Sequence, residues 1–395
     1  MKECKILHLV LKGDGITEVV AEDINIGLVE AGYNVTMAYL RDHDKALPKT
    51  VATSKVGLGL TTRLRFAFDW LALRRLSKLL LAGNYDVVLS HRYKPCILLM
   101  HLVRKFPAVE FVNVVHGTGH YDKPSRSKAI KRLAHERFRF VCVSDAVAEF
   151  IRNRCGVGTT ASPVEVIPNG IDIQELDAQQ LSRDNARLEL SLDNESIWIG
   201  FAGRLTEIKG VRELIRGFAP LAKTYPSAKL AILGKGELRH ELENLINSHD
   251  LQDQVSLLGQ VPLARRYFKA FDAFILPSYR EGMSIALLEA MATGLPLLVS
   301  DIPMNTALID ENAIIFEAKK SESISIALQA FLESESVKLE ADGKANRRLA
   351  VMKYDIGVFR KNYLELIQEL CGESRRELAP LFVKGRNTST SFCND

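Results

Sequence analysis

The chain has 395 residues, of which 47% are hydrophobic and 25% are charged, with 25 glycines and 13 prolines. This composition excludes a collagen, a coiled coil and a mainly disordered chain. At roughly 100 to 200 residues per domain, the length predicts two domains, each large enough to bury a core. The net charge of +4 hides an asymmetry, because residues 1–169 carry 25 Lys and Arg against 16 Asp and Glu. A basic first half suits a partner that bears phosphate groups.

The cysteines and the apolar runs bear on where the protein works. No Cys-x-x-Cys pair and no zinc-like spacing is present, so we expect six free thiols of a reducing compartment: Cys4, Cys96, Cys142, Cys155, Cys371 and Cys393. The apolar run 6–11 is too short for a signal sequence, and no run approaches 18 apolar residues. We therefore expect a cytoplasmic protein that is at most peripheral to a membrane.

Apolar strands alternate with helical patterns along the chain, which predicts an α/β fold with parallel sheets. In the first half we expect strands over 4–11, 34–40, 87–90, 111–115, 139–143 and 164–167, and helices over 17–31, 64–81 and 146–154. In the second half we expect strands over 197–202, 229–233, 255–258, 273–276 and 295–300, and helices over 211–222, 238–248, 264–270 and 284–293.

The first series of strands and helices stops at a turn signal, Pro168-Asn169-Gly170. We place a hinge there, between a first domain over 1–169 and a second over 170–350. A helix within 351–371 is expected to pack back toward the first domain, and the polar segment 372–395 is expected to be disordered.

The loop after the strand 273–276 carries the strongest chemical signal. Glu281 and Gly282 follow the carboxyl end of this strand, where open α/β sheets bind ligands. Ser284 is a good N-cap for the helix that follows, whose free N–H groups attract an anion. Glu289 is the sole polar residue on the apolar run 285–292, and a buried carboxylate there needs a partner. A structural role for Glu289 is the alternative to ligand binding.

A second loop, after the strand 197–202, contains Arg204 and Lys209 between Gly203 and Gly210. Two cations at the end of one strand suit a diphosphate, because Arg contacts two oxygens at once and Lys adds a point charge. The alternative is a solvated basic loop.

These motifs, in their order and spacing, resemble the retaining glycosyltransferase family 4 of the GT-B fold. The resemblance rests on Gly203-Arg204-Leu205, Lys209-Gly210, Gly234-Lys235-Gly236, the two glutamates with seven residues between them, and 290–296. It implies two Rossmann-like domains that face a central cleft, with the acceptor on 1–169 and the donor, a UDP or GDP sugar, on 170–350. The reaction implied is transfer of a hexose to a hydroxyl of a glycan or lipid-linked acceptor, as in lipopolysaccharide synthesis.

The resemblance also implies roles for individual residues. Arg204 and Lys209 would hold the donor diphosphate, Glu289 the ribose and Glu281 the transferred sugar. The backbone N–H groups of the loop before the helix would bind phosphate and sugar; the residues of this loop are Gly282, Met283, Ser284 and Ile285. The backbone of Val261 would contact the base of the donor. No metal is expected, since the two cations and the helix dipole supply the positive charge.

In the first domain the family has a glycine-rich loop and a His-Gly turn. Gly15 would contact phosphate, but the loop here interposes Asp14 and lacks the adjacent glycines of many members. His116, after the strand 111–115, would orient a hydroxyl of the donor sugar. Asp14, His120 and Tyr121 are candidates for contact with the acceptor.

The segment 123–140 holds seven cations against one acid, and its apolar residues fall at helical spacing over 125–138. This pattern predicts a basic amphipathic helix that contacts an anionic membrane surface or a phosphorylated glycan; the alternative is a solvated face.

Other classes of protein fit less well. The Gly-x-Gly motifs at Gly13 and Gly234 have Glu18 and Arg239 in place of the third glycine of a nicotinamide-binding domain, and no acidic residue for a ribose ends the strand after the second motif. A nucleotide-sugar epimerase or hydrolase of the same fold is the main alternative. A nucleic-acid-binding module is not supported, because the aromatic signatures of RNA binding are missing.

Overall fold

The computed structural model describes residues 4–11, 16–41, 47, 49–60, 70–158 and 161–376. These residues form two compact units. Unit 1 comprises the described residues of 1–142 and 148–167 together with those from Arg360 onward, and unit 2 comprises 143–147 and 168–359.

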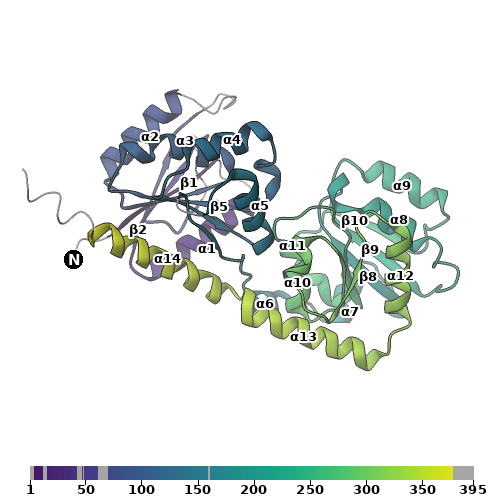
Figure 1. Ribbon diagram of the computed structural model, residues 1–395. Coiled ribbons are helices and arrows are strands. Elements are labelled where there is room, and N and C mark those ends of the chain that lie inside the picture. The colour runs from purple at the N-terminus through teal and green to yellow at the C-terminus, as the bar shows by residue number, and fades with distance from the viewer. Residues whose placement is uncertain are drawn as a thin grey trace, which may run out of the picture. The chain divides into compact units, whose positions relative to one another are not determined.

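Unit 1 is built on a parallel sheet of seven strands in the order β3-β2-β1-β4-β5-β6-β7 (Figure 1). The strands are β1 (Lys5–Val10), β2 (Asn34–Tyr39), β3 (Ser54–Gly57), β4 (Val87–His91), β5 (Glu110–Val115), β6 (Phe138–Cys142) and β7 (Val164–Val166). The helices are α1 (Ile16–Glu30), α2 (Trp70–Gly83), α3 (Tyr93–Leu102), α4 (Pro124–Leu133) and α5 (Asp145–Cys155), with the 3₁₀ turns η2 (Val103–Lys105) and η3 (Thr118–His120).

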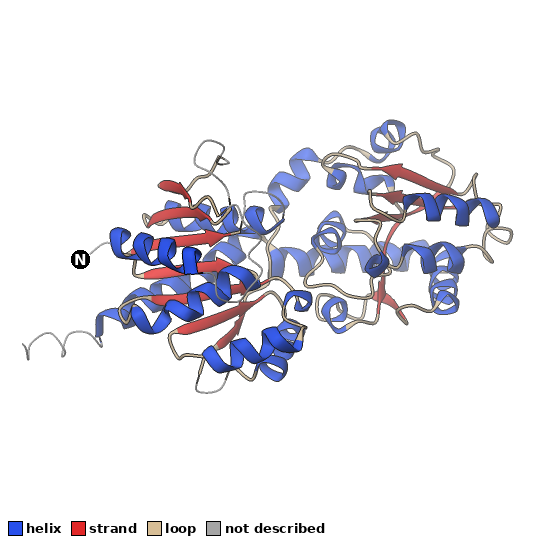
Figure 2. Cartoon of the chain, turned by 90° about the horizontal axis from the view of Figure 1, so that it is seen from above, coloured by secondary structure: helices blue, strands red, loops and turns tan. Residues whose placement is uncertain are grey.

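Unit 2 contains a second parallel sheet, of six strands in the order β10-β9-β8-β11-β12-β13. Figure 2 draws the strands of both sheets in red and the helices in blue. The strands are β8 (Ile197–Ala202), β9 (Ala228–Leu233), β10 (Val255–Gly259), β11 (Ala273–Leu276), β12 (Leu297–Ser300) and β13 (Ala313–Phe316). The remaining elements are α6 (Ile173–Gln179), α7 (Arg183–Glu189), η4 (Glu207–Lys209), α8 (Val211–Phe218), α9 (Arg239–Ser248), η5 (Ala264–Ala270), α10 (Ile285–Thr293), α11 (Pro303–Thr306), α12 (Ser321–Leu332), α13 (Ser336–Tyr354) and α14 (Ile356–Arg376). The prediction of two parallel α/β sheets is therefore confirmed.

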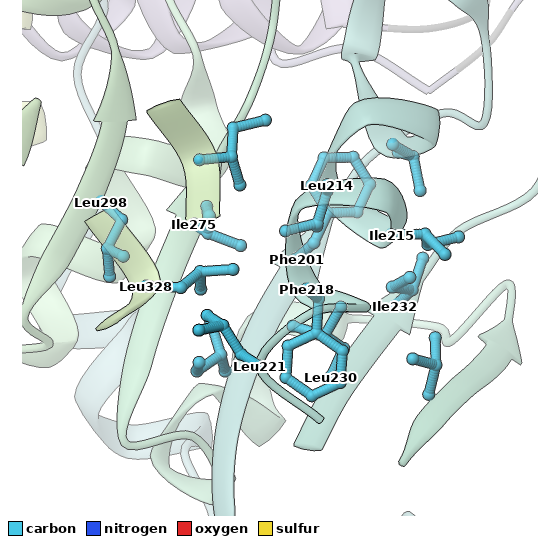
Figure 3. Packing of buried hydrophobic residues seen from close by; sticks show 14 of the residues in the cluster. Phe201, Leu214, Ile215, Phe218, Leu221, Leu230, Ile232, Ile275, Leu298 and Leu328 are labelled. Atoms are coloured by element: carbon cyan, nitrogen blue, oxygen red, sulfur yellow. The ribbon is translucent and has the colours of Figure 1, made fainter. Parts of the chain in front are cut away.

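The core of unit 2 holds its central strands rigid. Phe201 and Leu230 from neighbouring strands pack against Leu214 and Phe218 of α8, and Leu328 of α12 completes the layer (Figure 3). All five side chains are fully buried. Burial of one such side chain contributes roughly 1.5 to 3 kcal/mol, so the strand ends that carry the loops below are firmly anchored.

The strand order of each sheet reverses at one place. In unit 1 the reversal lies between β1 and β4, and in unit 2 between β8 and β11. Loops that leave the carboxyl ends of two such strands run in opposite directions and leave a crevice, which is where open α/β sheets bind ligands. The fold thus marks one edge of each sheet as a candidate site.

Helix α14 begins in unit 2 and belongs to unit 1 from Arg360 onward. In unit 1 Arg360 lies 3.5 Å from the carboxylate of Asp23, and Arg139 lies 3.0 Å from that of Glu369. The helix continues to Arg376, beyond the point at which we expected the polar tail to start, and residues 377–395 lie outside the described residues.

The prediction of six free thiols is wrong for two of them. Cys4, just before β1, and Cys371, in α14, form a disulfide. Their separation of 367 residues hid the pair, since the fold alone brings the two ends of the chain together. Cys96, Cys142 and Cys155 are free and buried, and Cys393 lies outside the described residues.

The expected series lacked β3, α3, α6, α7, α11, α12, α13 and β13, and one expected element was misread. Helix α3 was missed because its residues 96–100 are all apolar, and an apolar run without periodicity does not distinguish helix from strand. Strand β13 was missed because it lies at the edge of its sheet and is half-exposed. The basic helix α4 ends at Leu133 rather than Phe138, because Phe138 already pairs with Phe111 as the first residue of β6.

Candidate active site

The candidate donor site lies at the carboxyl ends of β8 and β11, where backbones pack closely. Gly210 has a φ of 68°, and a Cβ there would lie 2.0 Å from the carbonyl oxygen of Pro277. The Tyr279 N–H donates to the Ile208 carbonyl at 2.8 Å, and the Tyr279 hydroxyl donates to Glu213. The two loops are therefore clamped together at a position that only glycine permits.

Arg204 and Lys209, the two predicted phosphate ligands, stand in different environments. Lys209 Nζ lies 2.5 Å from Glu281 Oε1, and both side chains are largely buried, with exposures of 14% and 10%. Arg204 is exposed, and within the described ranges its guanidinium has no hydrogen bond or ion pair, although its carbonyl accepts from the Thr206 N–H at 3.0 Å. Lys209 and Glu281 thus form one unit that joins β8 to β11, while Arg204 carries an uncompensated charge beside it. Sequence spacing did not indicate this pairing.

The loop after β11 leads into the first turn of α10. The Ser284 side chain caps the helix by accepting from the Leu287 N–H at 3.4 Å, as predicted. Met283 is buried, and its sulfur accepts from the Asn169 N–H at 3.0 Å. Among the described residues, no protein acceptor meets the N–H groups from Gly282 to Ile285. This first turn can therefore bind an anion through its backbone.

Glu289 lies one turn further along α10 and has no polar partner for its carboxylate within the described part of the chain. Burial raises its pKa to about 7, and the positive charge of Arg265 opposes this shift only in part. Arg265 is itself engaged by Gln179 and by Glu175, 3.2 Å away. A carboxylate held without a partner is suited to accept hydrogen bonds from a ligand such as a ribose.

The predicted base contact, Val261, lies in the turn between β10 and η5 and is half-buried. Gly259 just before it has a φ of 74°, and its carbonyl accepts from the Gly234 N–H at 2.7 Å. A Cβ on Gly234 would lie 1.8 Å from the Gly203 carbonyl oxygen. The loops after β8, β9 and β10 are thus packed backbone to backbone, and Val261 follows the last of these contacts by two residues.

In unit 1 His116 lies directly after β5, and two histidines that sequence reasoning missed stand next to it. His116 Nε2 lies 2.7 Å from His91 Nδ1, and His91 Nε2 lies 2.5 Å from His8 Nε2. His8 Nδ1 lies 2.6 Å from Asn25 Oδ1. Burial lowers the pKa of His8 to about 4 and that of His116 to about 3. The one available signal was a histidine inside an apolar strand, at His8 and again at His91.

The other predicted residues of unit 1 are dispersed. Tyr121 is buried in the core, where its hydroxyl accepts from Asn113 Nδ2 at 2.9 Å and burial raises its pKa. His120 is exposed, and its carbonyl accepts from Arg126. Asp14 and Gly15 lie outside the described residues.

The segment 123–140 divides into structural and exposed cations. Arg137 donates to the Phe106 carbonyl, Arg139 pairs with Glu165 and Glu369, and Arg126 lies 4.9 Å above the ring of Tyr93. The remaining cations, Lys123, Lys128, Lys131 and Arg132, are exposed. The basic face of α4 is therefore shorter than predicted. None of the helices within the described ranges is both long and apolar enough to cross a membrane.

Comparison with known proteins identifies the fold and its family. The model of the family described as "Glycosyltransferase Family 4" matches residues 17–175, and that described as "Glycosyl transferases group 1" matches 182–349. Two Rossmann-like domains with these loops define a glycosyltransferase of the GT-B class. The chain belongs to the group 1/family 4 glycosyltransferases, as the sequence motifs predicted.

Individual relatives are more distant. The chain is 31% identical over 254 residues, which is 61% of it and 64% of the relative, to an Escherichia coli UDP-Gal:alpha-D-GlcNAc-diphosphoundecaprenol alpha-1,3-galactosyltransferase. Its matches span 34% to 65% of the length of the first curated relatives.

Solved structures show the same fold at lower identity. Anabaena HepE in complex with UDP superposes with a TM-score of 0.76 at 18% identity over 92% of this chain and all of that one. WaaG, a glycosyltransferase involved in lipopolysaccharide biosynthesis, has a TM-score of 0.70 at 15% identity over 91% of this chain and 98% of its own.

Proposed function

We propose that this protein transfers a hexose, with retention of configuration, from a nucleoside diphosphate sugar to a hydroxyl of a glycan or lipid-linked acceptor. The product belongs to lipopolysaccharide or a related surface polysaccharide. The observation that carries the proposal is the Lys209–Glu281 pair at the switch point of unit 2, beside the exposed Arg204 and the open first turn of α10. Family membership supports the same reaction class.

Each group has a separate task in the donor complex. Arg204, Lys209 and the first turn of α10 stabilise the negative charge that develops on the departing diphosphate. Glu289 accepts from the ribose hydroxyls, and Glu281, held in place by Lys209, accepts from the transferred sugar. His116 of unit 1 contacts a sugar hydroxyl. Because the positive charge comes from side chains and a helix terminus, the reaction does not depend on a metal ion.

The relatives support the nature of the substrates. HepE was solved with UDP, and the E. coli relative is named for a UDP-galactose donor and an acceptor linked to diphosphoundecaprenol. Both support a UDP sugar as the donor for this chain, and the E. coli relative alone supports a lipid-linked acceptor.

A lipid-linked acceptor resides at a membrane surface, and unit 1 offers a basic contact for one. Lys128 in the middle of α4 and Lys131 and Arg132 in its last turn are exposed, and Lys123 lies just before its start. Each cation near an anionic lipid surface contributes about 1 kcal/mol, so that together they bind a headgroup layer reversibly. We place the anionic surface contact on these four residues of the segment 123–140.

The test is a panel of UDP-glucose, UDP-galactose, UDP-N-acetylglucosamine and GDP-mannose, screened by protection of the full chain from thermal unfolding. A ligand at 100 times its Kd stabilises by about 2.7 kcal/mol, which is readily measured. Products formed with the best donor are then analysed with and without acceptor. Protection by no nucleotide sugar contradicts the proposal, whereas a converted sugar in the absence of any acceptor identifies an epimerase or hydrolase.

A further inference from the structure

Three imidazoles stand in one row across the centre of the unit 1 sheet. Leu89 of β4 lies opposite His8 of β1, and His91 is two residues further along the same strand. Val114 of β5 lies opposite His91, and His116 is again two residues further. Since side chains two residues apart on a strand share a face, the parallel register places all three rings on one side of the sheet. The ring centroids are 4.8 Å and 5.0 Å apart.

The buried end of the row decides the direction of its hydrogen bonds. Asn25, on α1, points its carbonyl oxygen at His8 Nδ1 and its amide nitrogen at the sulfur of Met37, 3.6 Å away. A carbonyl oxygen can only accept, so His8 carries its proton on Nδ1. The opposite orientation of the amide would bring its oxygen against the sulfur and lose the weak N–H···S bond.

The remaining protons follow from this one. His8 Nε2 is then an acceptor, so the proton between His8 and His91 lies on His91 Nε2. His91 Nδ1 becomes an acceptor in turn, and His116 donates to it from Nε2. A neutral imidazole carries one N–H, which leaves His116 Nδ1 as a bare acceptor.

We propose that this chain of hydrogen bonds holds His116 with its proton on Nε2 and thereby fixes His116 Nδ1 as the acceptor for a substrate hydroxyl. Asn25, His8 and His91 are then positioning residues that act through His116. The inference rests on the proposed function for the identity of the ligand, a sugar hydroxyl, and adds which atom of His116 receives it and what sets that choice.

At the other end of the row, His116 has one ring nitrogen without a hydrogen-bond partner in the described part of the chain. His116 Nδ1 is buried and has no hydrogen-bond partner among the described residues. An unpaired buried acceptor is costly and calls for an explanation, which a ligand hydroxyl supplies. A hydroxyl that donates to Nδ1 satisfies this atom without breaking any bond of the row. A ligand that could only accept a hydrogen bond is rejected at the same place.

The rings are ordered as neutral groups. His8 and His91 are fully buried, and burial lowers the pKa of His8, His91 and His116. The charges that face His116, from Arg92 and from His120 when it is protonated, lower its pKa further. At neutral pH each ring therefore carries a single proton, and the position of that proton is the only variable.

The test reads proton positions directly, without substrate. The full chain is labelled with ¹⁵N-histidine, and imidazole nitrogens are correlated with ring protons by NMR. The nine histidines are assigned through His-to-Gln variants at residues 8, 91 and 116. We expect the proton on Nδ1 of His8 and on Nε2 of both His91 and His116. A proton on Nδ1 of His116 in the folded wild type overturns the proposal.

Variants of Asn25 separate positioning from packing. Asn25→Leu removes the acceptor while keeping the volume, so His116 should become a mixture of tautomers and kcat/KM for the best nucleotide sugar should fall roughly tenfold, the equivalent of one hydrogen bond. Asn25→Asp still accepts from His8 and should restore both readouts. Asn113→Leu is the matched control, because Asn113 is equally buried in unit 1 but bonds to Ser90 and Tyr121 instead.

The outcomes distinguish this inference from the proposed function. A shifted tautomer with slower turnover in Asn25→Leu, rescued by Asn25→Asp and absent in Asn113→Leu, supports the inference. An unchanged His116 tautomer in a folded Asn25→Leu variant overturns it, even if transferase activity is established. If the wild type turns over no nucleotide sugar, the proposed function fails, and the wild-type spectrum still decides the proton order.

Discussion

The carboxyl edges of the two sheets share one strand topology but carry side chains of different charge. At the edge of unit 2, Arg204, Lys209 and Glu281 place full charges on loops that glycines hold together. At the edge of unit 1, the side chains at the switch point are histidines that burial keeps neutral. A diphosphate requires compensating charge, whereas a hydroxyl requires only a correctly oriented donor or acceptor. Under the proposed function, the charge at each switch point follows the ligand, since the two sheets share one backbone plan.

The largest effect is expected from removing the uncompensated cation of unit 2. Arg204→Ala should lower the rate of transfer by a factor of roughly 100 or more, which is typical of losing one preorganised electrostatic group. Binding of the nucleoside diphosphate should weaken far more than binding of the nucleoside, as measured by calorimetry. Lys344→Ala, on the surface of α13, serves as the control and should change neither. An equal loss for nucleoside and diphosphate would show that Arg204 is not a phosphate ligand.

The second prediction concerns the exposed cations of α4 on the surface of unit 1, in contrast to the neutral buried histidines of the same unit. Replacing Lys128, Lys131 and Arg132 together by Glu should weaken binding to anionic lipid vesicles by about 100-fold, since each cation contributes about 1 kcal/mol. Donor binding should not change. Sedimentation with phosphatidylserine vesicles at low and high salt measures the effect, because screening weakens such contacts. If the wild type does not sediment, or the variant sediments equally, α4 is only a solvated helix.

The third prediction is that the buried carboxylate of Glu289 lowers the stability of the ligand-free protein. Its pKa is raised to about 7 from an ordinary 4.5, so the folded state loses stability as the pH rises through about 7, by at most roughly 3 kcal/mol. Glu289→Gln should therefore raise the Tm of the ligand-free protein at pH 8 and lower donor affinity roughly tenfold. Glu281→Gln, which abandons its ion pair with Lys209, should not raise the Tm. A Glu289→Gln variant that is less stable at pH 8 would contradict the burial argument.

The histidines of unit 1 predict the opposite dependence on pH. The pKa of His8 is lowered to about 4 and that of His116 to about 3, from 6.5 when unfolded. The unfolded state then binds more protons, so the free energy of unfolding should decrease as the pH falls from 6.5 toward 4, by roughly 1.4 kcal/mol per pH unit for each histidine. Denaturant titrations measure this slope, which His8→Gln should reduce. His240→Gln should leave it unchanged, because that ring is 87% exposed.

The smallest effect is expected from a chelator. Because Arg204, Lys209 and the first turn of α10 supply the positive charge for the diphosphate, EDTA should leave the transfer rate unchanged. Initial rates with and without EDTA, followed by addition of Mg²⁺, provide the measurement. If EDTA abolishes activity and Mg²⁺ restores it, the side chains of unit 2 do not by themselves neutralise the diphosphate. The contrast between the charged edge of unit 2 and the neutral edge of unit 1 would then be weaker.

Much of the site in unit 2 was predictable because its residues are local. Ser284 caps α10 as expected, and the loops that carry Arg204 and Glu281 follow the predicted strands. Each of these features depends on residues within one turn or one loop, so the local pattern contains the information. The Lys209–Glu281 pair was not predicted, since it spans 72 positions and depends on β8 lying beside β11.

The row of histidines in unit 1 could not be predicted from the sequence. His8 and His91 lie in mainly apolar strands, and nothing near them in the chain indicates a partner. Only the strand order β1-β4-β5 and its register bring them to His116. The disulfide between Cys4 and Cys371 also depends on tertiary structure, since it joins the residue before β1 to helix α14.

The sequence by itself determined the fold class, the family and the positions of the candidate loops after their strands, because hydrophobic periodicity, capping and motif spacing act over a few residues. The tertiary structure decided which charges are paired, which cysteines are bonded and which way the protons of three imidazoles point. Those properties depend on contacts between segments distant in the chain, where strand order and register set the distances and burial sets the charge of each group.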